Sequence, residues 1–170
     1  MGIDKGTLLK DGKSWARIVS DQILTLNIPC KISINKDQVN DYQTIFSEQE
    51  LIGDQVDIPG PLRGILSAHQ QYPEKNWLIM ACDMTDMDNE TLIRILKAKE
   101  EMPGKEFYVY RNERLYEPFG GIYTAAGLHQ VYDLYRKNLL KDFSLQHVLN
   151  TCKTYTLESE NNEAAFRNYN

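Results

Sequence analysis

A continuous apolar run that ends on a carboxylate constrains the fold of this chain more than any other segment. The run extends from Trp77 to Cys82 and is followed by Asp83. Loop residues flank it on both sides, so it predicts a central β-strand that is buried on both faces. A carboxylate at the carboxyl end of such a strand lies in the crevice where α/β proteins bind ligands. Asp83 is therefore a candidate functional residue, and its alternative role is to cap a turn or the next helix.

The composition is that of one ordinary globular domain. The chain has 170 residues, of which 42% are hydrophobic and 25% are charged, and its net charge is −5. This balance predicts a single domain, residues 1–170, with its own core. No basic tract points to a nucleic-acid partner, and the apolar runs are shorter than the ~18 residues of a membrane span. The first ten residues carry charges and no apolar signal-peptide stretch, so we expect a cytoplasmic protein.

The cysteines and histidines form no recognisable site in the sequence. Cys30, Cys82 and Cys152 are widely separated, and their odd number without a Cys-x-x-Cys pair argues against a disulfide framework or a zinc site. We therefore expect reduced, buried thiols. The three histidines fall in separate predicted helices without a second ligand at metal-binding spacing, so we expect no metal site from them.

Helical and extended segments alternate along the chain. Apolar residues recur with helical spacing from Trp15 to Leu26, and Ser14 and Ser144 are suitable N-caps. The predicted helices are 13–26, 39–46, 62–71, 89–101, 125–137 and 144–151, and the predicted strands are 31–35, 50–52, 77–82, 106–111, 116–124, 153–157 and 165–170. The alternation predicts an α/β fold with three α/β/α layers. Its sheet would be mostly parallel, with strands 31–35, 77–82 and 106–110 and one antiparallel excursion.

Three short segments in a fixed order carry a family resemblance. They are Asp4-Lys5-Gly6 near the start, Gly60-Pro61-Leu62-Arg63-Gly64 before a helix, and Asp83 after the apolar strand. A lysine can contact phosphate as a point charge, and Gly60 lets a ligand approach the backbone closely. In this order the segments resemble the molybdenum cofactor guanylyltransferases, the molybdopterin-guanine dinucleotide biosynthesis protein A family of the nucleotidyltransferase superfamily. The resemblance covers almost the whole chain.

The resemblance implies a Rossmann-like nucleotidyltransferase fold and an enzymatic activity. Members transfer GMP from GTP to molybdopterin and release pyrophosphate, with Mg²⁺ as the cofactor. The implied partners are GTP, molybdopterin and proteins of molybdoenzyme maturation. Such a transfer needs its phosphate charge neutralised, and Mg²⁺ favours one or two carboxylates together with substrate phosphates.

The resemblance also assigns catalytic and metal-binding roles. Asp83 would hold the metal together with Asn170, which lies in an Asn-x-Asn segment at the end of the chain. Asp83 and Lys5 would act in catalysis, with Lys5 on the nucleotide phosphates. Asp4 would orient the lysine.

GTP binding would involve five residues in all. Lys5 and Asp83 would lie at the phosphates, and Asn35, Asp54 and Gly60 would contact the guanosine. An asparagine can pair with a base edge or a ribose, and an aspartate can accept hydrogen bonds from hydroxyls or guanine N–H groups. Apart from the resemblance, Asn35 and Asp54 are typical turn residues.

Both ends of the chain depart from the family. A Gly-rich phosphate loop precedes the Asp4-Lys5 segment in the family, and a last helix follows the Asn-x-Asn segment; neither is present here. We expect either a chain truncated at both ends or a protein that closes its sheet differently. In this fold the first strand lies between the strands at 31–35 and 77–82, so its absence predicts two open sheet edges.

Two other functions remain open from the sequence. A non-catalytic member would lack the phosphate loop and use the sheet as a binding module. A sugar-phosphate nucleotidyltransferase would share the fold and the strand-end aspartate. Guanine rather than cytosine specificity rests on the resemblance at Gly60-Pro61-Leu62-Arg63-Gly64.

Overall fold

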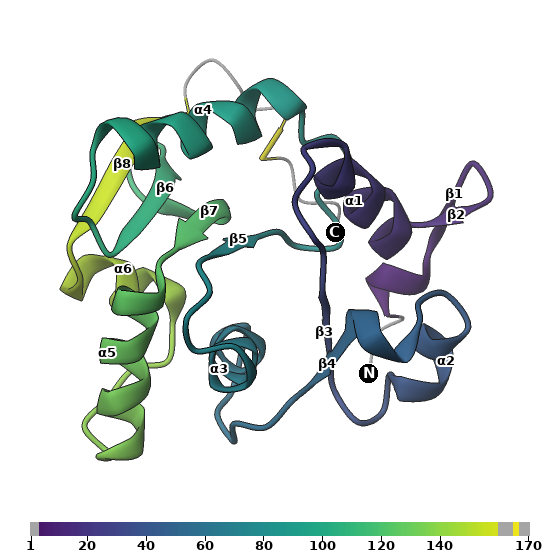
Figure 1. Ribbon diagram of the computed structural model, residues 1–170, viewed down its shortest axis with the longest axis horizontal. Coiled ribbons are helices and arrows are strands. Elements are labelled where there is room, and N and C mark those ends of the chain that lie inside the picture. Colours follow the sequence, from purple (N-terminus) through teal and green to yellow (C-terminus); the bar gives the residue numbers. More distant parts are fainter. Residues whose placement is uncertain (1–3, 160–164, 167–170) are drawn as a thin grey trace.

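Residues 4–159 and 165–166 are described in a computed structural model of the protein (Figure 1). The helices are α1 (Trp15–Thr25), α2 (Val39–Gln43), α3 (Leu62–Gln71), α4 (Asn89–Glu101), α5 (Ala125–Arg136), α6 (Leu145–Thr151) and the short 3-10 helices η1 (Lys5–Thr7) and η2 (Glu48–Glu50). The strands are β1 (Leu9–Lys10), β2 (Lys13–Ser14), β3 (Ile32–Ile34), β4 (Leu51–Gly53), β5 (Trp77–Ile79), β6 (Phe107–Arg111), β7 (Tyr116–Tyr123) and β8 (Thr154–Glu158). The predicted mixture of helices and strands is confirmed.

Hydroxyl side chains start several helices where the sequence predicts them. The Ser14 hydroxyl accepts a hydrogen bond from the Arg17 N–H at 3.3 Å, and the Ser144 hydroxyl accepts one from the His147 N–H at 3.2 Å. Each bond satisfies one of the backbone donors that a helix start leaves without an intrahelical partner. Local sequence therefore fixes where α1 and α6 begin.

The strands form two sheets and one small ribbon. β3 and β4 pair in parallel, and β1 and β2 form the antiparallel ribbon. The larger sheet has the order β5-β7-β6-β8. Within it, β7 is antiparallel to both β5 and β6, whereas β8 is parallel to β6. The hairpin predicted from 106–124 is confirmed as β6 and β7.

The prediction of a central buried strand at 77–82 is wrong. β5 covers only Trp77–Ile79, is half-buried, and lies at the edge of the larger sheet. β3 belongs to the other sheet, so the segments 31–35 and 77–82 do not share one. Within the described ranges, no strand pairs with the outer edge of β3 or of β5. An apolar run indicates burial, but strand neighbours are set by residues far away in the sequence.

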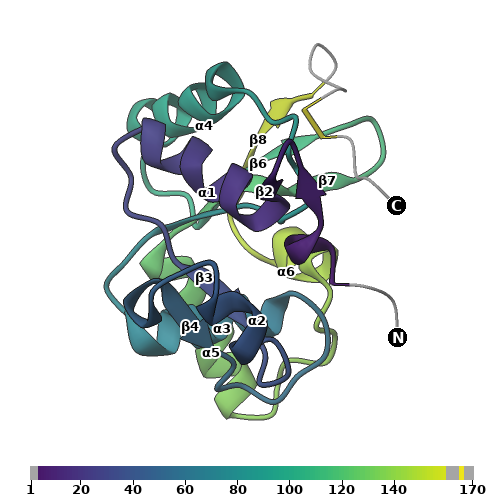
Figure 2. The same ribbon diagram turned by 90° about the vertical axis from the view of Figure 1, so that its right-hand side faces the viewer.

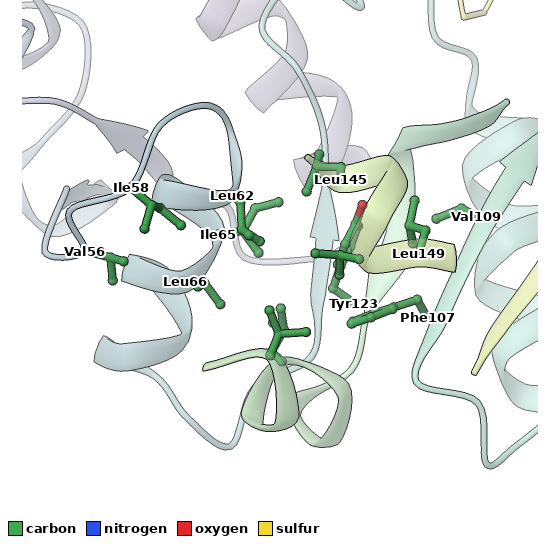
Figure 3. Close-up of a cluster of buried hydrophobic side chains, with 13 residues drawn as sticks. Val56, Ile58, Leu62, Ile65, Leu66, Phe107, Val109, Tyr123, Leu145 and Leu149 are labelled. Carbon is green, nitrogen blue, oxygen red and sulfur yellow. The ribbon is translucent and has the colours of Figure 1, made fainter. Parts of the chain in front are cut away.

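The main hydrophobic core lies between the larger sheet and helices α3, α5 and α6 (Figure 3). Phe107 of β6 and Tyr123 of β7 are fully buried, with ring centroids 4.9 Å apart. Leu62 and Leu66 of α3 approach from one side and Leu149 of α6 from another. Each fully buried side chain of this size contributes ~1.5–3 kcal/mol of transfer free energy. This core fixes α3 against the sheet.

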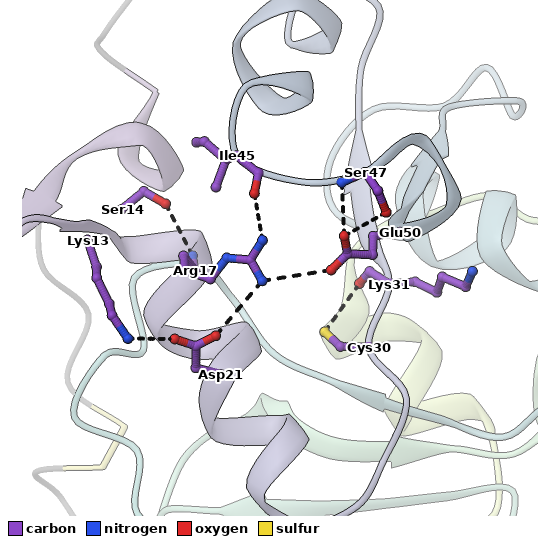
Figure 4. A network of polar contacts seen from close by, with 9 residues as sticks. All are labelled: Lys13, Ser14, Arg17, Asp21, Cys30, Lys31, Ile45, Ser47 and Glu50. Atoms are coloured by element: carbon purple, nitrogen blue, oxygen red, sulfur yellow. Dashed lines mark hydrogen bonds and ion pairs between the residues drawn. The ribbon is translucent and has the colours of Figure 1, made fainter.

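A polar network fixes α1 against the segment between α2 and β4 (Figure 4). The Arg17 guanidinium donates a 2.5 Å hydrogen bond to the Ile45 carbonyl and lies 4.2 Å from the Phe46 ring centroid. It also approaches the Asp21 and Glu50 carboxylates at 3.9 and 3.8 Å. Planar guanidinium groups suit such combined ionic and stacking contacts. The network holds α1 on one side of β3, with α3 on the other (Figures 1 and 2).

Two sequence expectations concern the chain as a whole. Among residues 4–159 and 165–166, no helix is long and apolar enough to cross a membrane. The three cysteines are free thiols, and each is partly buried rather than fully buried. Two of them, Cys30 and Cys82, lie at the cavity described below.

Candidate active site

Lys5 and Asp83 are far apart in the sequence but form an ion pair. The Lys5 Nζ lies 3.1 Å from the Asp83 Oδ2. The lysine comes from η1, and the aspartate lies four residues after the end of β5. The Asp83 side chain is only 14% exposed, whereas that of Lys5 is 38% exposed. The structure thus brings together the two residues predicted to act on the phosphates.

A second lysine–aspartate pair joins the same two segments. The Lys10 Nζ lies 3.1 Å from the Asp86 Oδ1, and both side chains are more exposed than Asp83. The sequence suggests only a helix-start role for Asp86. Because an exposed pair of this kind contributes ~0–1 kcal/mol, its main effect is to fix the direction of the chain. Both pairs hold the amino-terminal segment against the turn at 83–86.

Asp4 organises the short helix that carries Lys5. Its Oδ1 accepts hydrogen bonds from the Gly6 N–H at 2.9 Å and the Tyr42 hydroxyl at 3.2 Å, and its Oδ2 accepts one from the Gln38 side-chain amide at 2.6 Å. Burial, followed by the charge of Asp4, raises the pKa of Tyr42. Asp4 therefore ties η1 to α2, which agrees with its predicted role in orienting Lys5.

Gly6 is required by close packing rather than by its backbone angles. A Cβ atom at this position would lie 1.9 Å from the Tyr42 hydroxyl oxygen and 3.1 Å from its Cζ. Tyr42 is itself buried, at 4% exposure, so its ring has little room to move. The glycine thus lets η1 approach α2 closely enough for the Asp4 contacts.

A cavity of about 930 Å³ lies beside this ion pair. Its walls come from β3 and β5 and from α1 and α3. Asp4 and Cys82, which precede Lys5 and Asp83 in the chain, are in its lining, and so are Asn35, Asp54 and Gly60. The three residues predicted to contact the nucleoside therefore share one cavity, and the predicted phosphate residues are adjacent to it.

Several polar groups of the cavity lie near the carboxyl end of β3, and we call this region the polar end. It comprises Asp4, Asn35, Gln38, Asp54 and Arg63. The Asp54 N–H donates to the Ile34 carbonyl at 3.0 Å, which places Asp54 next to Asn35. The arrangement follows the rule that α/β proteins bind ligands outside the carboxyl ends of their strands.

Asp54 is paired with Arg63, a residue of the Gly60–Gly64 segment. The Asp54 Oδ2 lies 3.7 Å from an Arg63 terminal nitrogen, and the Arg63 Nε donates to the Ile58 carbonyl at 2.6 Å. Burial raises the pKa of Asp54, and the Arg63 charge opposes that shift. Gly60 precedes α3 with φ of 76°, in the left-handed region that favours glycine. A ligand can thus approach the Gly60 backbone without a Cβ atom in the way.

Asn35 forms the turn that its residue type predicts. Its Oδ1 accepts hydrogen bonds from the backbone N–H groups of Asp37 and Gln38 at 2.9 and 3.2 Å. In return, the Gln38 Oε1 accepts from the Asn35 N–H at 2.9 Å. The Asn35 side chain lines the cavity while fixing the turn, so a role in binding would use its amide N–H₂ group.

The residues present fit a magnesium ion that is completed by substrate. Across the described ranges, no group of three or more His, Cys, Asp or Glu side chains could hold a metal ion by itself. Asp83 offers one hard carboxylate, and Mg²⁺ is commonly bound by one or two carboxylates plus substrate phosphates and water. Asn170, the second predicted ligand, lies outside the described residues.

Sequence reasoning missed several residues of the site. Gln38 and Tyr42 on or next to α2 carry no local signal of their contacts with Asp4, because those contacts cross 34 and 38 positions. Cys82 was expected to be a buried thiol only. Burial, followed by the charges of the nearby Asp83 and Asp4 carboxylates, raises its pKa to about 11. Cys82 therefore stays protonated at neutral pH.

Together, the fold and site define an α/β protein in which a lysine and a carboxylate form an ion pair beside a cavity at strand ends. The chain belongs to the family of the MobA-like NTP transferase domain, which matches residues 1–153. The predicted family and the predicted class of enzyme, a nucleotidyltransferase, are thereby confirmed.

Named relatives agree with this assignment. The chain is 24% identical over 173 residues to a probable molybdenum cofactor guanylyltransferase of Methanothermobacter thermautotrophicus, covering all of this chain and 88% of that protein. It is 28% identical over 160 residues to the molybdenum cofactor guanylyltransferase of Histophilus somni, covering 85% and 80%.

A solved structure agrees with the fold. The crystal structure of molybdopterin-guanine dinucleotide biosynthesis protein A from Archaeoglobus fulgidus superimposes with a TM-score of 0.76 at 16% identity. The match covers 99% of this chain and 85% of that chain. At this identity the likeness shows the fold alone, and it confirms the predicted nucleotidyltransferase fold class.

Proposed function

We propose that this protein transfers GMP from GTP to molybdopterin and releases pyrophosphate in a Mg²⁺-dependent reaction. The observation that carries the proposal is the contact between Lys5 and Asp83 beside a cavity lined by Asn35, Asp54 and Gly60. Names of relatives support the choice of guanine and molybdopterin, because one relative is named a probable molybdenum cofactor guanylyltransferase and the other a molybdenum cofactor guanylyltransferase.

The bond changes assign each residue a task. A phosphate oxygen of molybdopterin attacks the α-phosphorus of GTP, and the bond from that phosphorus to the oxygen bridging to the β-phosphate breaks, so pyrophosphate leaves. Lys5 neutralises charge on the phosphates, and Asp83 orients Lys5 and offers a metal ligand. Bound Mg²⁺ would supply further positive charge at the phosphates. Positioning and electrostatics account for most of the acceleration in phosphoryl chemistry of this kind.

The polar end would hold the nucleoside. Asp54 can accept hydrogen bonds from ribose hydroxyls or guanine N–H groups, and Asn35 can pair with a base edge. The Arg63 contact keeps the Asp54 carboxylate in place. Because Gly60 has no Cβ atom, the base or the ribose could contact its main chain directly.

The test is release of pyrophosphate with GTP, Mg²⁺ and molybdopterin. Asp83→Asn should lower the rate by ~10²–10³, the cost typical of removing one positioned electrostatic group. Asp86→Asn is the matched control. Asp86 lies in the same turn as Asp83, but its carboxylate pairs with Lys10 and not with Lys5. We expect that variant to keep its rate within about threefold, since exposed pairs contribute little.

Other substrates separate the competing functions. Faster pyrophosphate release with CTP than with GTP would indicate specificity for cytosine rather than guanine. Pyrophosphate release that requires a sugar 1-phosphate as acceptor would indicate a sugar-phosphate nucleotidyltransferase. If no nucleotide and acceptor pair gives pyrophosphate, while calorimetry still detects GTP binding, the protein is a binding module. Equal rates for wild type and Asp83→Asn would contradict the assigned role of Asp83.

A further inference from the structure

His69 is a buried titratable residue that the proposed reaction does not use. It lies on α3 and is only 1% exposed. Among the described residues, its Nδ1 atom is buried without a hydrogen-bond partner. Ile65 and Ala68 of the same helix line the cavity described above, whereas His69 is not in that lining. Its surroundings are instead the contact between α3 and α5.

The imidazole ring of His69 packs against two aromatic rings of α5. Its centroid lies 6.2 Å from the His129 ring centroid and 6.0 Å from the Tyr132 ring centroid, and both pairs have edge arrangements. Tyr132 also packs against the main hydrophobic core, to which Leu66 of α3 belongs. The ring of His69 is therefore part of the contact that holds α3 on α5 (Figure 1).

This contact disfavours a protonated imidazole. A neutral imidazole has one N–H donor and an imidazolium has two, and a buried donor without an acceptor costs free energy. Burial, followed by the charge of His129, lowers the pKa of His69, whereas the charge of Glu74 opposes that shift. The groups that face His69 are thus His129 and Tyr132 of α5 and Glu74 after α3. Asp133 of α5 lies instead beside His129, with its Oδ2 4.0 Å from the His129 Nε2.

The same helix holds the segment that carries Asp54 of the polar end. The Ser67 hydroxyl oxygen accepts hydrogen bonds from the Gln55 N–H at 2.8 Å and the Val56 N–H at 3.3 Å. Arg63, one turn earlier on α3, lies 3.7 Å from the Asp54 carboxylate. A displacement of α3 would therefore displace the polar end of the cavity as well.

We propose that His69 is a pH-sensitive contact, which in its neutral form holds α3 on α5 and on protonation releases α3 and loosens the polar end. The only covalent change is the addition of one solvent proton to the imidazole. His69 is a positioning residue in this role, because it acts on the polar end through α3. The inference does not rest on the proposed nucleotidyl transfer.

The first test is the dependence of stability on pH. The folded-state pKa of His69 is lowered from 6.5, so its contribution is present above pH 6.5 and is lost as the pH falls below that value. His69→Phe keeps a ring at the position but cannot bind the proton. Between pH 7.5 and 5.5, the folding equilibrium constant of wild type relative to His69→Phe should fall by a factor of about two to ten, and ten is the limit for one proton. Urea denaturation measures this ratio, and a constant ratio would overturn the proposal.

Gln70→Phe is the matched control. It places the same side chain at the neighbouring, exposed position of α3 and removes no titratable group. The folding equilibrium constant of wild type relative to Gln70→Phe should therefore stay constant between pH 7.5 and 5.5. A fall as large as that for His69→Phe would overturn the proposal, because a phenylalanine anywhere on this helix would then produce the response.

Amide hydrogen exchange tests where the molecule loosens. Wild type and His69→Phe are compared at the same pH, so the intrinsic pH dependence of exchange cancels. On lowering the pH from 7.5 to 5.5, the exchange rate of wild type relative to the variant should rise at least about twofold for α3 and for the amides of Gln55 and Val56. For Phe107–Tyr110 of β6 it should stay within about 1.5-fold. An equal rise in β6 would overturn the release of α3, because the whole molecule would then be opening.

A measurement on wild type alone keeps the proposal testable if His69→Phe does not fold. NMR titration of the imidazole C–H resonances gives the protonation midpoint of His69 directly. The midpoint should lie below 6.5, and a midpoint at or above 6.5 would overturn the proposal. Circular dichroism establishes whether His69→Phe folds, and His69→Leu replaces it in the stability and exchange tests if it does not.

Discussion

Gly6 shows how one small residue sets the position of a catalytic candidate. Its neighbour Lys5 reaches Asp83 only because η1 packs directly on Tyr42, and that packing leaves no space for a side chain at position 6. Asp4 connects both features by accepting hydrogen bonds from the Gly6 N–H and the Tyr42 hydroxyl. The geometry of Lys5 is therefore a consequence of contacts made by its two neighbours in the chain.

Gly6→Ala should destabilise the protein by ~1–3 kcal/mol, as overpacking of a tight contact commonly does. The reason is the 1.9 Å separation between the new Cβ and the Tyr42 hydroxyl oxygen. In a Tyr42→Phe background that oxygen is gone, so the same substitution should cost at least about 1 kcal/mol less. Urea denaturation of the four proteins of this double-mutant cycle measures the coupling. Additive effects of the two substitutions would contradict this account.

At the scale of elements, the capping interactions of η2 should make the unfolding free energy depend on pH. The Glu50 carboxylate accepts hydrogen bonds from the Ser47 hydroxyl at 2.7 Å and the Ser47 backbone N–H at 2.9 Å. These two bonds, together with the Arg17 and Lys31 charges, lower the pKa of Glu50 below its usual value of 4.5. They also join η2 to the Arg17 network that holds α1.

The stabilising effect of Glu50 should disappear in acid. Its folded-state pKa is lowered, so its contribution is present above the unfolded pKa of 4.5 and is lost as the pH falls through the lower, folded-state pKa. Wild type should exceed Glu50→Gln in unfolding free energy at about pH 6, and the difference should shrink as the pH falls below 4.5. Urea denaturation at several pH values measures this. A difference between wild type and Glu50→Gln that stays constant over this pH range would contradict the prediction.

The elements also show what the sequence can and cannot predict. α3 spans the predicted residues 62–71, and Ser14 and Ser144 cap the predicted helices, because helical periodicity and capping are local signals. The predicted central position of β5 in the sheet is wrong, because the pairing partners of a strand depend on residues far away in the sequence. The same limit applies to the site. A local pattern identifies Asp83 as a candidate, and the family resemblance identifies Lys5. Neither signal predicts the contact between Gln38 and Asp4.

At the scale of the whole molecule, the two sheets differ in how they are supported. β6 lies between β7 and β8 and is almost fully buried along its length, whereas β3 is three residues long and has one strand partner, β4, among the described residues. The cavity separates them, with α1 and α3 spanning it. Short strands with an open edge open more easily than strands paired on both sides.

Rates of amide hydrogen exchange should therefore differ between the two sheets. The amides of Ile32–Ile34 in β3 should exchange at least about tenfold faster than those of Phe107–Tyr110 in β6, because fewer contacts must break to expose them. Mass spectrometry of peptic fragments measures both strands together. Equal exchange in β3 and β6 would mean that the two sheets open as one cooperative unit, since a shared opening reaction gives a shared rate.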